Sequence, residues 1–179
     1  MARALIIVDF QNDFTPGGAL PVADGDVIAD RLNALAGSGA FDLVVATRDW
    51  HPAEHSSFAV NGGPWPVHCV AGSAGAELHP NLDRNQLDEI VDKGQSVDTD
   101  GYSGFAGTDL EALLREHDVT EVTVAGLATD YCVKNTALDA LRAGFAVTVD
   151  STAVRGVEIE PGDSERALAD VRAAGGVVA

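Results

Sequence analysis

The stretch ALIIVD (Ala4–Asp9) is an unbroken run of apolar, mostly β-favouring residues that ends in a carboxylate. A strand with one face in water alternates apolar and polar residues, whereas a strand covered on both faces is apolar throughout. The run therefore predicts a parallel strand at the centre of a sheet, with Asp9 at its carboxyl end.

Outward from this run, apolar strand patterns alternate with helical spacing. Strands are expected at 42–49, 87–93, 121–127 and 145–152, with a last edge strand at 176–179. Helices are expected at 27–36, around 110–114, from about 131 to 143, and at 164–174. This order predicts an α/β fold, a three-layer α/β/α sandwich with a central, mostly parallel sheet. At 179 residues the chain fits one domain, residues 1–179.

The chain is strongly acidic, with 28 acidic and 11 basic residues and a formal net charge of −17. Nucleic acids and anionic membranes attract clustered Lys and Arg, so neither is expected as a partner. No apolar run approaches the roughly 20 residues of a membrane span, and the N-terminal run is too short for a signal peptide. Two cysteines do not make a disulfide framework. We expect a soluble, cytoplasmic protein.

Four reactive side chains follow the predicted strands. Asp9, Asp49 and Lys93 each close a strand, and Cys132 stands where the next helix begins. Sites in parallel sheets form outside the carboxyl ends of the strands. A helix N-terminus or a cation lowers a thiol pKa, although a lone cysteine is more often buried filler. Together these residues suggest that Asp9 exchanges a proton with Cys132 while Lys93 holds Asp9 in place.

A second cluster lies in the segment Trp50–Asp83, which is too long for a plain connector. Asp49, His51 and His55 fall within seven residues, and His68 follows. Each histidine alone reads as a polar loop residue, but together these residue types suit Fe²⁺, Mn²⁺ or Zn²⁺. We therefore expect one divalent metal ion.

Three aromatic residues are expected at the same edge of the sheet as Cys132, namely Phe14, Trp65 and Tyr102. They could stack on a flat ring, or they could simply pack beneath loops.

Together, the motifs IVDFQNDF, TRDWHPAEHSSF, GPWPVHCVAGSAGAEL, VDKG and AGLATDYCVKNTALDA resemble the nicotinamidase/pyrazinamidase branch of the isochorismatase-like cysteine hydrolases over nearly the whole chain. The resemblance implies that Cys132 is the nucleophile, Asp9 the general base and acid, and Lys93 the third member of a triad. The triad is typical of the whole superfamily, whereas the histidine-rich site is typical of this branch.

The resemblance also implies a metal held by Asp49, His51, His55 and His68, with Phe14, Trp65 and Tyr102 lining a ring pocket. It further implies a cis peptide between Leu127 and Ala128, and an oxyanion hole made of the backbone N–H groups of Ala128 and Cys132.

The implied reaction is hydrolysis of nicotinamide, and of pyrazinamide, through a Cys thioester. The products from nicotinamide are nicotinic acid and ammonia, a step of NAD salvage. The metal would hold the pyridine nitrogen.

Two alternatives stay open on the sequence. One is another hydrolase of the superfamily, acting on isochorismate or an N-carbamoyl compound. The other is a metal-binding protein without enzymatic activity. A homo-oligomer is compatible with the family, and Trp50, Glu54 and Tyr131 have no assigned role.

Overall fold

A computed structural model describes residues 1–179 and contains one six-stranded sheet in the order β3-β2-β1-β4-β5-β6. All neighbouring strands are parallel. The strands are β1 (Ala2–Val8), β2 (Leu43–Asp49), β3 (Glu89–Lys93), β4 (Val119–Leu127), β5 (Ala146–Arg155) and β6 (Val177–Val178). The predicted, mostly parallel sheet is thus confirmed, and it is parallel throughout.

The run that opens the chain lies at the centre of the sheet, where β1 pairs with β2 on one side and β4 on the other. Leu5 and Ile7 pack into the core on one face, and Ala4, Ile6 and Val8 pack into the core on the other. All five are fully buried. Burial on both faces explains why no polar residue interrupts the run.

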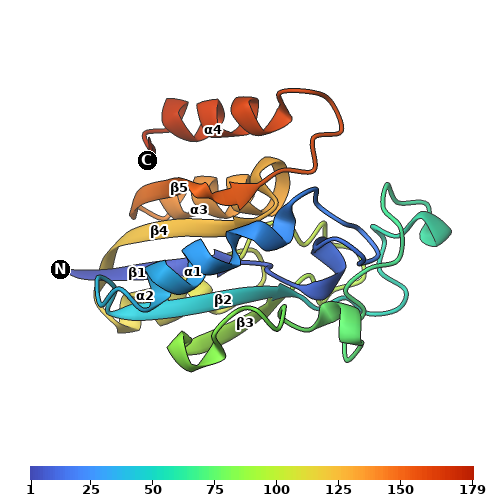
Figure 1. The fold of residues 1–179 in the computed structure, drawn as a ribbon, viewed down its shortest axis with the longest axis horizontal. Helices are drawn as coiled ribbons and strands as arrows, with labels where there is room; N and C mark the ends of the chain where they lie inside the picture. Colours follow the sequence, from blue (N-terminus) through green and yellow to red (C-terminus); the bar gives the residue numbers. More distant parts are fainter.

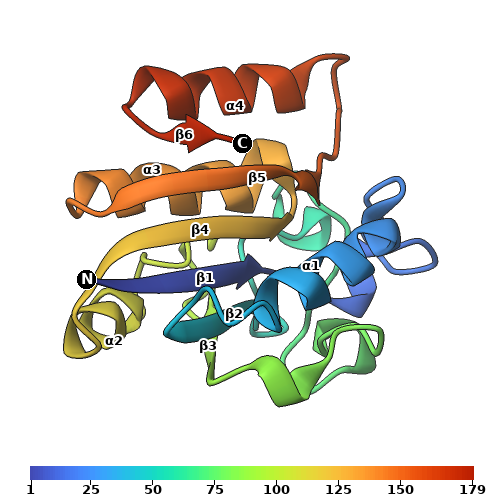
Figure 2. The same cartoon turned by 60° about the vertical axis from the view of Figure 1, so that its left-hand side comes forward.

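Helices cover both faces of the sheet, which gives the predicted three layers (Figures 1 and 2). The helices are α1 (Ala29–Ala36), α2 (Leu110–Glu116), α3 (Lys134–Arg142) and α4 (Asp163–Ala173). Helix α1 packs with the Leu5 face, while α2, α3 and α4 contribute to the core on the Ile6 face. None of the four has both the length and the apolarity that a membrane crossing demands.

Two expected helices begin differently from the pattern. The pattern over 27–36 starts with a 3-10 turn, Gly25–Ile28, and Val27, which the pattern counted among the apolar positions, is 57% exposed. The helix expected from about 131 is preceded by a π-helical turn, Thr129–Val133, in which Val133 N–H donates to Ala128 O. The wider turn places Cys132 ahead of α3 rather than inside it.

An ion pair joins α1 to β5. Arg31 Nη2 lies 2.6 Å from Asp150 Oδ2, and Thr152 donates to Asp150 Oδ1 from its N–H and its hydroxyl. Burial alone would raise the pKa of Asp150, but the hydrogen bonds from Thr152 and Arg31 outweigh burial and lower it.

We expect Asp150→Asn to reduce the free energy of unfolding at pH 7 by about 1 kcal/mol, since Arg31 is half exposed and the pair is screened. A carboxylate with a lowered folded pKa stabilises the fold above its unfolded pKa, about pH 4. That contribution disappears as the pH falls through the folded pKa. Urea unfolding at pH 7 and pH 3 checks this: the difference between the two proteins should shrink at pH 3, and a constant difference would contradict it.

Candidate active site

Because all strands are parallel, their carboxyl ends lie at the same end of the sheet, next to the long segment between β2 and β3 (Figure 1). Asp9 follows β1, while Asp49 and Lys93 end β2 and β3 and are register partners. Strand β4 can approach β1 here because Gly126 has φ +113°, and a Cβ at this position would overlap the Val8 carbonyl oxygen. The close approach brings the turn with Cys132 to Asp9.

Lys93 is the centre of the reactive group. Its Nζ lies 2.7 Å from Asp9 Oδ2, 2.5 Å from Asp49 Oδ1 and 3.5 Å from Cys132 Sγ, and it donates to Gly101 O at 2.6 Å. Asp9 also accepts from the Thr47 hydroxyl at 2.7 Å. The structure therefore brings Asp9, Lys93 and Cys132 together, as the sequence predicts, and places Asp49 beside them.

Charge and burial set the protonation of this group. Burial alone would lower the pKa of Lys93, but Asp49 and Asp9 hold it well above its usual value, so Lys93 stays charged. Burial raises the pKa of Asp9, which Lys93 offsets only in part.

The expectation of a lowered thiol pKa is wrong. Burial raises the pKa of Cys132 well above its usual value, and Asp9 and Asp49 add to this, while Lys93 acts in the opposite direction without outweighing them. The resting thiol therefore keeps its proton. A base must remove that proton before the sulfur can attack, and Asp9 is the carboxylate placed to do so.

The predicted metal ligands Asp49, His51 and His68 offer atoms that lie within 4.8 Å of one another. His51 Nδ1 lies 2.8 Å from Gly94 O, and His68 Nδ1 lies 2.8 Å from Pro66 O. With these carbonyls accepting from Nδ1–H, each Nε2 keeps a free lone pair, and both Nε2 atoms face Asp49 Oδ2. This donor set fits a divalent cation.

Tight backbone packing holds His51 in place. Gly94 has φ +64°, and a Cβ there would lie 2.5 Å from His51 Cε1. A larger residue at this position would push the imidazole away from Asp49.

His55 lies beside the group of three rather than within it. Its ring stacks on His51 with centroids 3.9 Å apart, and its Nδ1 lies 2.7 Å from Ser57 Oγ. Its Nε2 is buried without a hydrogen-bond partner. Burial and His51 lower the pKa of His55 to about 4, which leaves the imidazole neutral and able to ligate. Its role as a fourth ligand stays a prediction.

One supporting residue escapes the sequence reasoning. The buried amide of Gln11 donates to Asp49 O at 2.8 Å and to Ala76 O at 2.7 Å, and its Oε1 accepts from Asp49 N–H at 2.8 Å. Gln11 thus fixes the backbone that carries the Asp49 carboxylate. The sequence shows only a glutamine two positions after Asp9.

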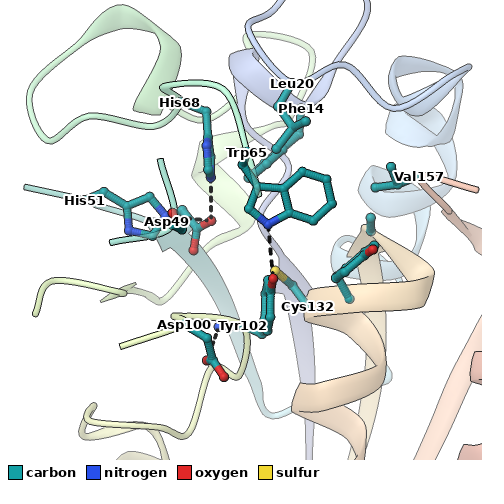
Figure 3. Close-up of a pocket in the computed structure, with 13 residues that line it drawn as sticks. Phe14, Leu20, Asp49, His51, Trp65, His68, Asp100, Tyr102, Cys132 and Val157 are labelled. Carbon is teal, nitrogen blue, oxygen red and sulfur yellow. Dashed lines mark hydrogen bonds and ion pairs between the residues drawn. The ribbon is translucent and has the colours of Figure 1, made fainter. Parts of the chain in front are cut away.

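One pocket is lined by Cys132 and by the predicted metal ligands Asp49, His51 and His68 (Figure 3). The three predicted aromatic residues line it, and Trp65 Nε1 donates to the Tyr102 hydroxyl at 3.0 Å. The full lining is Phe14, Leu20, Asp49, His51, Ser57, Trp65, His68, Asp100, Tyr102, Ala128, Tyr131, Cys132 and Val157. Sequence reasoning did not find Leu20, Ser57, Asp100 and Val157, and it left Tyr131 open.

The turn before Cys132 has the expected backbone. The Leu127–Ala128 peptide is cis, as predicted, and Ala128 and Cys132 both line the pocket. A carbonyl group bound here would lie near backbone N–H groups and a thiol, the arrangement that acyl transfer needs.

Comparison with known proteins agrees with this geometry. Residues 3–179 match the isochorismatase domain. A nicotinamidase of Escherichia coli (strain K12) is 43% identical over 97% of this chain and 92% of its own length. The crystal structure of a pyrazinamidase of Pyrococcus horikoshii in complex with zinc is 46% identical, with a TM-score of 0.91 over 100% of this chain and 99% of that one. The structure of PnC1 from L. infantum in complex with nicotinate is 38% identical, with a TM-score of 0.95 over 99% and 92%.

Proposed function

This chain belongs to the isochorismatase family, and from that premise we propose that it hydrolyses nicotinamide to nicotinic acid and ammonia, and pyrazinamide to pyrazinoic acid. The observation that carries the proposal is one pocket lined by both Cys132 and the Asp49–His51–His68 group. A thiol suits the carboxamide, and a metal site suits the ring nitrogen. The curated relative of 43% identity is a nicotinamidase, which supports the same substrate.

The residues present can carry out the chemistry in two stages. Asp9 takes the proton of Cys132, and the thiolate attacks the carboxamide carbon. The backbone N–H groups of Ala128 and Cys132 stabilise the oxyanion. Asp9 then protonates the leaving nitrogen, ammonia departs, and water hydrolyses the thioester to the acid. Lys93 keeps Asp9 oriented throughout and balances its charge.

The metal site would fix the ring relative to the thiol. Asp49, His51 and His68 would hold the cation, with His55 as the further ligand; Zn²⁺, Fe²⁺ and Mn²⁺ all suit this donor set. A bound cation supplies an electrophilic anchor for the pyridine nitrogen. The zinc-bound pyrazinamidase supports a metal in this fold.

Ammonia release from nicotinamide and pyrazinamide tests the function directly. Purified protein with measured metal content should release ammonia and form the corresponding acid. Protein with full metal occupancy that releases none from either amide would refute the proposal, and activity on isochorismate or an N-carbamoyl compound instead would identify another branch of the family.

We expect His51→Ala to weaken zinc binding by a factor of roughly 100, because one ligand is lost and its ring no longer supports His55. The KM for nicotinamide should rise more than kcat falls. Zinc titration with a competing chelator gives the first value, and ammonia release gives the second. His117→Ala is the control, since His117 is exposed and its Nδ1 contacts only Leu113 O. Unchanged zinc affinity in His51→Ala would contradict the assignment.

We also propose that the protein works in the cytoplasm, where a reducing environment keeps Cys69 and Cys132 as free thiols. A homo-oligomer stays a prediction.

A further inference from the structure

The loop between β5 and α4 brings a side chain into the pocket that the proposed chemistry does not use. Val157 lies in this loop and lines the pocket together with Cys132. In Figure 3 it stands on the opposite side of Trp65 from His51 and Asp49. Val157 therefore belongs to the wall that faces the metal group across the pocket.

A single carboxylate holds this wall in place. Asp130 Oδ1 accepts from Val157 N–H at 2.9 Å, and Asp130 Oδ2 accepts from Glu158 N–H at 2.8 Å. Asp130 lies in the π-helical turn, two residues before Cys132. The turn that carries the nucleophile thus also anchors the wall opposite the metal group, although the two segments are 27 residues apart or more.

The anchored loop has a constrained path. Glu158 adopts φ +55°, in the left-handed region, and its carboxylate accepts from the N–H groups of Gly162 and Ser164 at 2.8 Å each. A Cβ on Gly156 would overlap Ser164 Oγ. The loop is therefore packed closely on both sides of Val157, and the Asp130 carboxylate fixes where the valine side chain enters the pocket.

The position of Val157 matters for which rings fit. When the ring nitrogen faces Asp49 and His51 and the carboxamide reaches Cys132, the remaining ring edge, centred on carbon 5 of nicotinamide, is left for the far wall. We propose that Asp130 is a positioning residue that holds Val157 against this edge and so limits the size of ring substituents. The proposal rests on nicotinamide as the substrate.

The test compares kcat/KM for 5-methylnicotinamide and nicotinamide in four proteins: wild type, Val157→Ala, Asp130→Ala and the double variant. Room for one more methyl group in a pocket changes the ratio of kcat/KM values by about tenfold. Each single variant should therefore raise kcat/KM for 5-methylnicotinamide, relative to kcat/KM for nicotinamide, about tenfold, mainly by lowering the KM for 5-methylnicotinamide. The double variant should gain no more than either single variant, because both act through the same side chain.

Asp163→Ala is the matched control. Asp163 also accepts a backbone N–H, from Glu160, and pairs with Arg166, but its side chain is 25% exposed and does not line the pocket. It should leave the selectivity ratio unchanged. If Asp130→Ala lowered kcat for both amides equally without changing the ratio, Asp130 would act on the nucleophile turn alone and the proposal would be overturned.

A second readout does not depend on the substrate. The rate at which Cys132 is alkylated by N-phenylmaleimide relative to iodoacetamide, followed by peptide mass mapping, reports the width of the pocket. We expect Val157→Ala and Asp130→Ala each to raise this ratio about tenfold, and an unchanged ratio would overturn the proposal. Should Asp130→Ala fail to fold, Asp130→Asn, which keeps one acceptor, should show a smaller increase in the same direction. Absence of ammonia release by wild type would refute the proposed function, whereas an unchanged alkylation ratio refutes the role of Asp130.

Discussion

Cys132→Ala is expected to lower kcat for nicotinamide by a factor of roughly 10⁴ or more, because the variant lacks the thiol that forms the acyl intermediate and Cys132 is the one cysteine that lines the pocket. Ligand binding should survive, since the metal group and the aromatic walls remain. Ammonia release measures the first effect, and zinc-dependent binding of nicotinate to the variant measures the second.

The other cysteine offers a matched control. Cys69 is also buried and free, but it lies in the core beneath the loops and does not line the pocket. Cys69→Ala should keep most of the activity and lose only some stability. Substantial ammonia release by Cys132→Ala would show that the thiol is not the nucleophile, even with nicotinamide as the correct substrate.

Lys93→Met is expected to reduce the free energy of unfolding by about 3–5 kcal/mol in metal-free protein, and to abolish activity. Lys93 is fully buried between the carboxylates of Asp9 and Asp49, which lie 2.7 and 2.5 Å from its Nζ. Without the ammonium, two buried carboxylates face each other uncompensated. Urea unfolding with EDTA present measures the loss.

Two comparisons separate charge balance from a general effect of removing lysine. Lys134→Met removes the only other lysine, whose partner Asp170 is about half exposed, and should cost less than about 1 kcal/mol. Asp9→Asn combined with Lys93→Met removes one of the two uncompensated buried carboxylates. The double variant should recover part of the free energy of unfolding that Lys93→Met loses. If Lys93→Met alone were as stable as wild type, the ammonium would not be what neutralises this group.

The central part of the fold could be predicted from the sequence because burial leaves a clear composition. The run Ala4–Val8 is apolar throughout. It lies between two strands, and helices cover both of its faces. The rule that parallel sheets form sites at the carboxyl ends of strands then grouped Asp9, Asp49 and Lys93. Asp9 follows β1 directly, and Asp49 and Lys93 are the last residues of β2 and β3, so an error of one or two residues in a strand boundary did not matter.

Other features depend on contacts that no local pattern reveals. Val157 is one valine in a loop, and no local pattern shows that its N–H donates to Asp130, 27 residues earlier in the chain, or that its side chain lines the pocket. Gln11 acts through backbone groups of Asp49 and Ala76, far away in the chain. The thiol pKa was mispredicted for a related reason: the helix N-terminus was visible in the sequence, but the burial of Cys132 beside Asp9 and Asp49 was not.

The two oxygens of Asp49 serve different neighbours: Oδ1 receives Lys93 Nζ, and Oδ2 faces the imidazoles of His51 and His68. The histidines could therefore be exchanged when the site is redesigned for a ring that lacks a nitrogen, because they carry no part of the charge that Lys93 requires. Asp49 could not be exchanged so freely, since its loss would leave the buried ammonium with Asp9 as its sole counter-ion. Asp49 therefore joins the proposed metal group to the Lys93 group, so under the proposed function neither ring binding nor bond cleavage could be redesigned at Asp49 without affecting the other.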